Sequence, residues 1–170
     1  SSSGRGSANL RKEPFRMYKR YTHEGGVATP LIVHWPDGLK DQNTLRHSPS
    51  HIIDIAPTCL NAAGLSTKGM EGQTLLPVFT KDSTQPRTLF WEHEGNRAVR
   101  QGDYKLVAQH STPWELYNMR KDRNELHDLS RSMPQKAAEL KKLYEAWAHR
   151  VGAKPWDEVS VIRKKNPPKK

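Results

Sequence analysis

The sequence is poor in cysteine, with Cys59 as the only one in 170 residues. A single cysteine excludes an intrachain disulfide and a zinc site built from several cysteines. Its neighbours Pro57 and Leu60 belong to an apolar, helix-like stretch, so we expect a buried and unreactive thiol. The sequence also lacks a long hydrophobic run and an apolar signal segment. These residues are therefore predicted neither to span a membrane nor to include a signal peptide.

Apolar residues are scarce as well. They make up 34% of the chain, against about 45–50% in typical globular domains on a count that includes Gly. A chain of this length can bury one sizeable core. The shortage is therefore typical of one part of a larger protein, as is a start at Ser1 instead of Met.

Acidic residues do not balance the basic ones, and the net charge is +10. Residues 1–20 contribute +5 and residues 163–170 another +5, whereas residues 21–162 are neutral. A nucleic-acid-binding domain concentrates its basic residues on a folded face. Here the excess lies at the two ends, which are predicted to be disordered, so nucleic acid is not expected to be a partner.

The first half of the chain contains the segments of an α/β sheet. Gly25 and Gly26 precede the apolar run 31–33, which Trp35 and Pro36 end. Such a run is typical of a strand buried on both faces. A short helix is expected over residues 54–64, begun by Asp54, with Pro57 in its first turn and Gly64 at its end. Its predicted buried side consists of Ile55, Cys59, Leu60 and Ala63.

The second half contains short strand-like runs separated by turn residues, and residues 114–118 alternate large apolar with polar side chains, as in an antiparallel sheet. Strands are expected over residues 88–93, 96–100, 104–108 and 114–118, and a tight turn joins the second to the third. A helix follows, begun by a capping box between Ser132 and Gln135 with Pro134 in the first turn, and ended by Gly152 and Pro155. Its apolar stripe consists of Leu140, Leu143, Tyr144, Trp147 and Val151. This stripe is expected to pack on the sheet.

The predicted fold class is therefore α/β, with the end of a mixed-sheet domain followed by a small four-stranded antiparallel sheet and a C-terminal helix. Four segments are expected. They are a flexible basic segment or loop at 1–13, the α/β portion at 14–86, the sheet and helix at 87–156, and a basic disordered tail at 157–170.

An ordered series of motifs resembles the later part of the sulfatase family, the arylsulfatase-type sulfuric ester hydrolases with an alkaline-phosphatase-like fold. The series begins with Lys19, HEGG at 23–26 and TPLIVHWP at 29–36. It continues through residues 54–58, 72–77, 91–100, 102–107 and 114–118, and covers roughly residues 14–156. The resemblance implies hydrolysis of sulfate esters, and a periplasmic or extracellular location.

Sulfatases use a formylglycine nucleophile, made from a Cys/Ser-x-Pro/Ala-x-Arg motif, and a calcium-type divalent cation. Leu60 and Asn61 after Cys59 do not fit that motif, and Lys136 replaces the arginine in the nearest serine version, at Ser132. No acidic cluster with an Asp-Asn pair is present either. The nucleophile and the metal ligands are therefore expected in a preceding half, with no metal or cofactor held by these residues.

The resemblance places Lys19 where sulfatases have the lysine that binds a sulfate oxygen. An ammonium is a compact charge with three donors, which suits a tetrahedral anion. Without the resemblance, Lys19 would be an ordinary surface lysine. His23 is a candidate for the pocket wall or a hydrogen-bonded loop histidine, and Glu24 is expected to be structural.

A second polar cluster follows the first strand of the predicted sheet. His93, Asn96 and Arg97 are candidates for contacts with the organic part of the substrate, or members of a structural turn. His93 and Glu94 also form part of a Glu-His-Glu run, but no further residue has metal-ligand spacing. A metal site is therefore not expected there.

We therefore predict the C-terminal fragment of a sulfatase acting on aryl or carbohydrate sulfates, inactive without the preceding half. The alternatives are a phosphatase or phosphonate hydrolase of the same superfamily, and a non-catalytic binding module.

Overall fold

The computed structural model describes residues 14–40, 43–83 and 86–165. They form two compact units, one built from residues 14–29 with residues 88–165 and the other from residues 30–87. The predicted segment 1–13 lies outside the described residues. The domain boundaries inferred from the sequence stay predictions, and residues 14–29 belong to the same compact unit as the sheet.

The first unit contains a four-stranded antiparallel sheet in the order β1-β2-β3-β4. The strands are β1 (Thr88–His93), β2 (Asn96–Gln101), β3 (Tyr104–Ala108) and β4 (Glu115–Asn118). Positive φ angles at Glu94 and Gly95 make the first hairpin turn, and Gly102 has a φ of 57° in the second. The short runs and the turn residues between them predicted these strands, and the structure confirms them.

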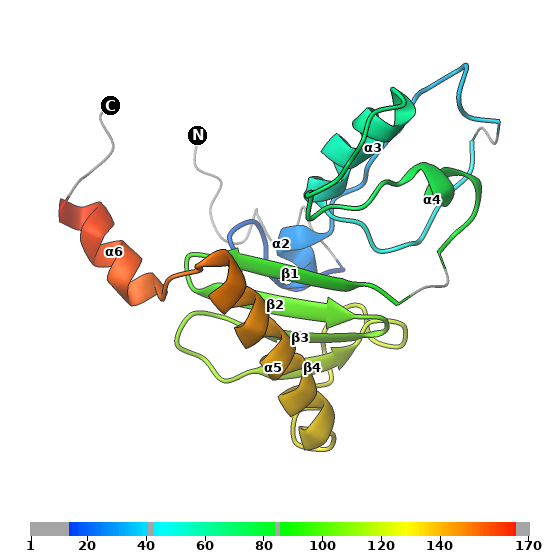
Figure 1. The fold of residues 1–170 in the computed structure, drawn as a ribbon. Helices are drawn as coiled ribbons and strands as arrows, with labels where there is room; N and C mark the ends of the chain where they lie inside the picture. Colours follow the sequence, from blue (N-terminus) through cyan, green and yellow to red (C-terminus); the bar gives the residue numbers. More distant parts are fainter. Residues whose placement is uncertain (1–13, 41–42, 84–85, 166–170) are drawn as a thin grey trace, which may run out of the picture. The chain divides into compact units, whose positions relative to one another are not determined.

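Helix α5 (Pro134–Val151) lies across one face of the sheet (Figure 1). Leu140 and Tyr144 are buried against Val99, Leu106 and Leu116 of the strands. The Trp147 ring stacks on Phe90 with 5.0 Å between the ring centroids. The predicted stripe is confirmed over these positions, although Val151 at the helix end is exposed.

The start of α5 differs from the predicted capping box. Met133 is the N-cap residue and Pro134 the first helical residue, with no side-chain cap. The Ser132 hydroxyl donates instead to the Leu129 carbonyl at 3.2 Å. At the other end, Gly152 has a φ of 68°, the left-handed conformation that favours glycine as a helix terminator.

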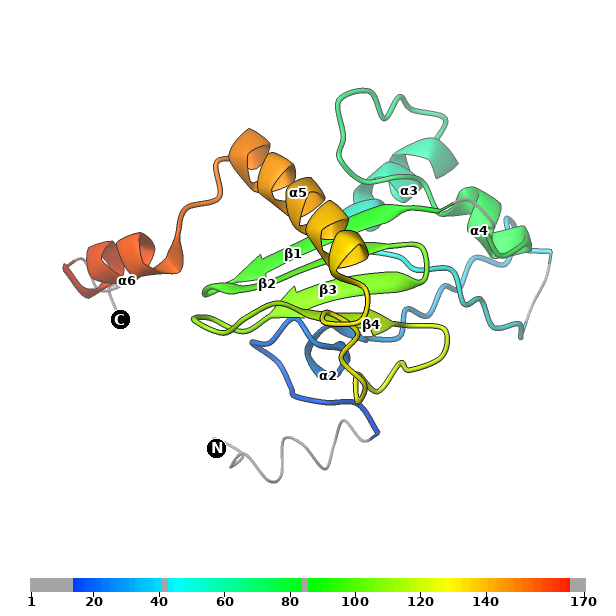
Figure 2. The same cartoon turned by 90° about the horizontal axis from the view of Figure 1, so that it is seen from below.

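The opposite face of the sheet is covered by the segment that contains the short helix α2 (Glu24–Val27), so the sheet lies between α5 and α2 (Figure 2). Ala98, Val107, Tyr117 and Met119 form a second buried cluster. Strands buried on both faces explain why Ala98-Val99 and Leu106-Val107 are apolar pairs and not alternations of apolar and polar residues.

The second unit contains the 3-10 helix η1 (Ile52–Asp54), α3 (Ile55–Ala62) and α4 (Leu76–Thr80). The Asp54 carboxylate accepts from the backbone N–H groups of His51 and Gln73, and pairs with the Arg87 guanidinium. Burial alone would raise the pKa of Asp54, but the Arg87 and backbone hydrogen bonds lower it. Asp54 therefore joins three segments. It is the N-cap residue of α3, as predicted, but its side chain makes no capping hydrogen bond to that helix.

The predicted strand at 31–33 is wrong for the described residues, where the segment has no regular secondary structure. Leu31 and Ile32 are 54% and 89% exposed. A strand needs a neighbour to satisfy its N–H and C=O groups, and no described strand pairs with these residues.

The predicted buried side of α3 is also wrong. Ile55, Cys59 and Ala63 are exposed, and the buried residues of this helix are Pro57 and Thr58. Leu60 is half-buried, and the Cys59 thiol is exposed and not buried.

The tail inferred to be disordered forms helix α6 (Trp156–Lys165) over most of its length. The Pro155 carbonyl accepts from the N–H groups of Glu158 and Val159. Asp157 and Glu158 lie in the first turn, where acidic side chains stabilise a helix. Residues 166–170 lie outside the described part. Among the described residues, no helix is long and apolar enough to cross a membrane.

Candidate functional site

Lys19 lies in a loop, residues 16–26, that closes on itself; we call it the Lys19 loop. The Gly25 N–H donates to the Arg16 carbonyl at 2.9 Å, and the Tyr21 N–H donates to the Tyr18 carbonyl at 3.1 Å. A Cβ at Gly25 would collide with the Arg16 carbonyl, and one at Gly26 with the Tyr21 carbonyl. Two glycines are therefore needed for the close approach of the two loop ends.

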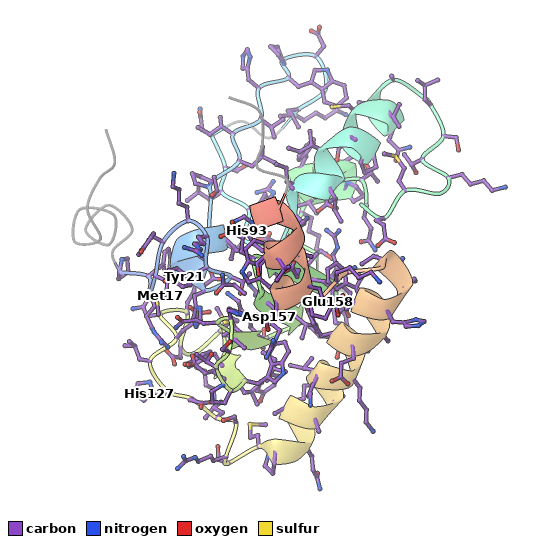
Figure 3. The ribbon with its side chains drawn as sticks, turned by 90° about the vertical axis from the view of Figure 1, so that its left-hand side faces the viewer. Met17, Tyr21, His93, His127, Asp157 and Glu158 are labelled. Carbon is purple, nitrogen blue, oxygen red and sulfur yellow. The ribbon has the colours of Figure 1, made fainter. Side chains whose placement is uncertain are left out.

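The backbone on either side of Lys19 is strained. Met17 and Arg20 have φ angles of 63° and 96°, which are uncommon for residues with a Cβ and persist only where the surroundings impose them. Figure 3 shows Met17 and Tyr21 on this loop beside α2. Strained backbone is common at functional sites. The surroundings of the loop therefore impose a backbone conformation that its own residues do not favour.

Arg16 anchors the start of the loop to the sheet unit. Its Nη1 donates to the Tyr117 hydroxyl at 2.8 Å and to the Glu125 carbonyl at 2.6 Å. The same nitrogen lies 3.4 Å from Glu115 Oε2. These contacts join residues about a hundred positions apart in the chain.

Glu24 anchors the end of the loop. One carboxylate oxygen lies 3.1 Å from Lys105 Nζ and the other 3.1 Å from Arg123 Nε. The Glu24 N–H donates to Glu125 Oε2 at 2.9 Å. Burial would raise the pKa of Glu24, but the charges and hydrogen bonds of Lys105 and Arg123 outweigh it and lower the pKa. Glu24 is therefore an anion with a structural task, as the sequence predicts.

His23 is buried beneath the loop and does not reach the surface. Its Nε2 lies 3.3 Å from Glu115 Oε2. The Tyr117 hydroxyl donates to the same carboxylate oxygen at 2.7 Å. The hydrogen bond with His23 is the main reason that the pKa of Glu115 falls to about 2, with burial opposing it and Tyr117 and Arg16 adding to it.

Lys19 itself is exposed. Within the described part of the chain its ammonium has no hydrogen bond or ion pair, although residues before and after it are anchored. A free ammonium on a fixed loop is suited to receive an anion.

The β1–β2 turn meets the loop through Asn96. This buried amide donates to the carbonyls of Arg20 at 3.2 Å and His93 at 3.0 Å. Arg20 Nε also lies 2.9 Å from Glu94 Oε2. His93 is exposed. The structure therefore brings His93 and Asn96 to the Lys19 loop, and Asn96 uses its amide hydrogens within the chain.

Arg97 lies on the other face of the sheet. Its guanidinium stacks over the Trp114 ring at 4.7 Å, and Trp114 packs with the residues of the α5 face. The structure therefore separates Arg97 from Lys19, His23 and Asn96. Contact of Arg97 with a substrate stays a prediction.

The residues that anchor the loop were not predicted from the sequence, because charged side chains are usually exposed. They are Arg16, Lys105, Glu115, Arg123 and Glu125. One signal was present: Lys105 lies in a strand with apolar residues on both faces, so its side chain had to be covered.

The described residues do not fit a divalent cation. No group of three His, Cys, Asp or Glu side chains in the described ranges could hold a metal ion. Glu24 pairs with Lys105 and Arg123. Glu115 pairs with Arg16 and His23.

A family model described as N-sulphoglucosamine sulphohydrolase, C-terminal, matches residues 14–149 of this chain. The chain belongs to this family of sulfatase C-terminal regions. The match confirms the resemblance drawn from the motifs and includes the Lys19 loop, the four strands and most of α5.

Curated relatives have sulfatase names. Arylsulfatase K of Danio rerio is 29% identical over 150 residues, which cover 79% of this chain and 28% of that protein. An uncharacterized sulfatase of Schizosaccharomyces pombe is 29% identical over 151 residues, 79% of this chain and 26% of that protein. The chain thus spans little more than a quarter of these relatives.

The crystal structure of Ps i-CgsB shares the fold with a TM-score of 0.51 at 24% identity, over 59% of this chain and 24% of that one. This likeness concerns the fold, an antiparallel sheet covered by a C-terminal helix, which the sequence predicted. The assignment to sulfatase C-terminal regions comes from the family match over residues 14–149.

Proposed function

We propose that this chain is the C-terminal part of a sulfuric ester hydrolase, and that Lys19 binds an oxygen of the sulfate group. The observation that carries the proposal is the combination of the family match over residues 14–149 with an exposed Lys19 that has no partner among the described residues and lies on an anchored, strained loop. An ammonium placed in advance stabilises negative charge on a non-bridging oxygen without reorganisation during the reaction.

The proposal assigns the formylglycine nucleophile and a calcium-type cation to another part of the complete protein. Neither Cys59 nor Ser132 lies in the motif that formylglycine requires, and no group of described side chains fits the cation. His93 and Asn96 belong to the proposed rim because Asn96 joins the β1–β2 turn to the loop. His23 is buried, so its proposed contribution is through the loop. Aryl or carbohydrate sulfates are the proposed substrates, and a periplasmic or extracellular location is part of the proposal.

The test uses the full-length protein that includes this chain, with 4-nitrophenyl sulfate and 4-nitrophenyl phosphate as paired substrates. We expect kcat/KM to be higher for the sulfate ester, and no turnover by residues 1–170 alone. A higher kcat/KM for the phosphate ester would favour the phosphatase alternative. Measurable sulfate hydrolysis by residues 1–170 would contradict the proposal, because it would require a nucleophile within these residues.

The non-catalytic alternative is tested by binding of the chain to duplex DNA across a salt series. The basic excess of the chain lies at its ends, so removal of residues 163–170 should weaken any such binding and reduce its salt dependence. Tight, salt-dependent binding that survives this truncation would place a nucleic-acid surface on the folded part.

A further inference from the structure

We propose that Lys105 is a positioning residue for Lys19: its buried ammonium joins Glu24, at the end of the Lys19 loop, to Glu125, on the segment after β4. This inference rests on the proposed function of Lys19 and deepens it. We call Glu24, Lys105 and Glu125 the buried charge cluster.

The three side chains form a closed arrangement. Lys105 Nζ lies 3.1 Å from Glu24 Oε1 and 2.9 Å from Glu125 Oε1. The second oxygen of Glu125 accepts the Glu24 N–H at 2.9 Å, so Glu125 holds both the backbone and, through Lys105, the side chain of Glu24. The side chains of Lys105 and Glu125 are fully buried.

The cluster is costly to build, which indicates a role that an apolar core would not supply. Buried charges are expensive to desolvate, and apolar residues of similar size often stabilise a protein as well or better. Glu125 also has a φ of 57°, an uncommon conformation for a glutamate. A buried ionic cluster nevertheless fixes one geometry, since its members have few alternative partners.

The geometry that it fixes is that of the loop. Glu24 is followed directly by Gly25, whose N–H closes the loop on the Arg16 carbonyl. Lys19 has no anchor of its own among the described residues, so the place of its ammonium follows from the loop ends. Misplacement of a reacting group by about 1 Å can cost on the order of a hundredfold in rate.

The experiment compares variants of the full-length protein. Lys105→Met removes the charge and keeps most of the volume. Lys105→Met with Glu125→Gln removes one charge of each sign and guards against a single variant that fails to fold. The matched control is Lys141→Met, on the exposed side of α5, where Lys141 pairs only loosely with Glu145 at 3.6 Å.

Two readouts separate positioning from stability. Hydrogen exchange of the amides of residues 16–28 reports whether the loop has loosened while the sheet amides remain protected. A double-mutant cycle with Lys19→Ala reports whether Lys105 acts through Lys19. We expect Lys105→Met to speed exchange in the loop and to lower kcat/KM about 10- to 100-fold. The loss should be much smaller when Lys19 is already alanine, and the charge-balanced double variant should recover part of it.

The same loss of kcat/KM in both Lys19 backgrounds would overturn the proposal, because Lys105 would then act through overall stability. An unchanged rate of exchange in the loop, or an unchanged kcat/KM despite faster exchange, would also overturn it. The failure of the proposed function has a different signature, since Lys19→Ala alone would then leave kcat/KM at the wild-type value.

Discussion

The Glu115 carboxylate couples the Lys19 loop to the sheet by a contact whose strength depends on pH. The pKa of Glu115 is lowered from 4.5 to about 2, first by the hydrogen bond with His23. A carboxylate with a lower pKa in the folded state stabilises the fold above its unfolded pKa, and this stabilisation is lost as the pH falls through the folded pKa. The stabilisation from Glu115 is therefore complete above about pH 5 and disappears between about pH 4.5 and pH 2.

Glu115→Gln should therefore lower the free energy of unfolding near pH 6 by an amount on the order of 3 kcal/mol. The difference from the wild type should shrink towards zero as the pH approaches 2. Urea unfolding of both proteins across this pH range measures it, and comparison of the two removes the contributions of Glu24 and Asp54, whose pKa values are also lowered. A difference that stays constant with pH would show that Glu115 is not the titrating group.

For single residues, the sequence indicated which side chains matter better than it indicated which residues contact them. Lys19 and Glu24 could be singled out because the motif around them is local. Lys105 and Glu125 could not, since their contacts with Glu24 join positions 81 and 101 residues apart. Asp54 shows the same limit, because its capping role was predicted locally while Gln73 and Arg87 claim its carboxylate.

Among the elements, α5 owes its place to one apolar stripe on the sheet. Leu140→Ala should lower the free energy of unfolding by about 2–5 kcal/mol, because Leu140 is fully buried against the strands. Glu145→Ala, on the exposed side of the same helix, should change it by less than about 0.5 kcal/mol. Chemical denaturation of the two variants checks the prediction. Equal effects would mean that α5 is held by its own helical propensity and not by packing.

The strands and α5 were predictable from short stretches of sequence, the strands as short runs bounded by turn residues and α5 from its 3.6-residue period. The segment 31–33 has an equally clear apolar pattern but no strand partner among the described residues. The start of α5 was misread because Ser132 satisfies a nearby carbonyl and not the helix N–H groups. Local pattern thus predicts elements that pack on one another within the chain, and fails where the partner is elsewhere.

For the molecule as a whole, several large apolar side chains of the second unit are exposed. Leu31, Ile32, Leu45, Ile52 and Leu65 are each more than half exposed. Large exposed apolar patches mark surfaces that are covered by another partner. If this chain is one part of a sulfatase, residues 31–33 should become a protected strand in the complete protein.

Hydrogen exchange compares the isolated 170 residues with the full-length protein. We expect the amides of residues 31–33 to exchange much more slowly in the full-length protein, while those of β2 and β3 change little. Equal exchange in the two proteins would mean that the segment is a surface loop in both, and that the predicted strand does not form there either.

The central claim is that Lys19 binds a sulfate oxygen, and kinetics of Lys19→Ala in the full-length protein test it most directly. Loss of one such electrostatic contact costs on the order of 10²–10³ in rate, or roughly 3–4 kcal/mol. We expect kcat/KM for 4-nitrophenyl sulfate to fall by this factor, with poor recovery in Lys19→Arg because a planar guanidinium does not replace a point charge. The melting temperature should barely change, since Lys19 is exposed. A kcat/KM near the wild-type value would return Lys19 to the surface lysines, and a large fall in the melting temperature would make its role structural.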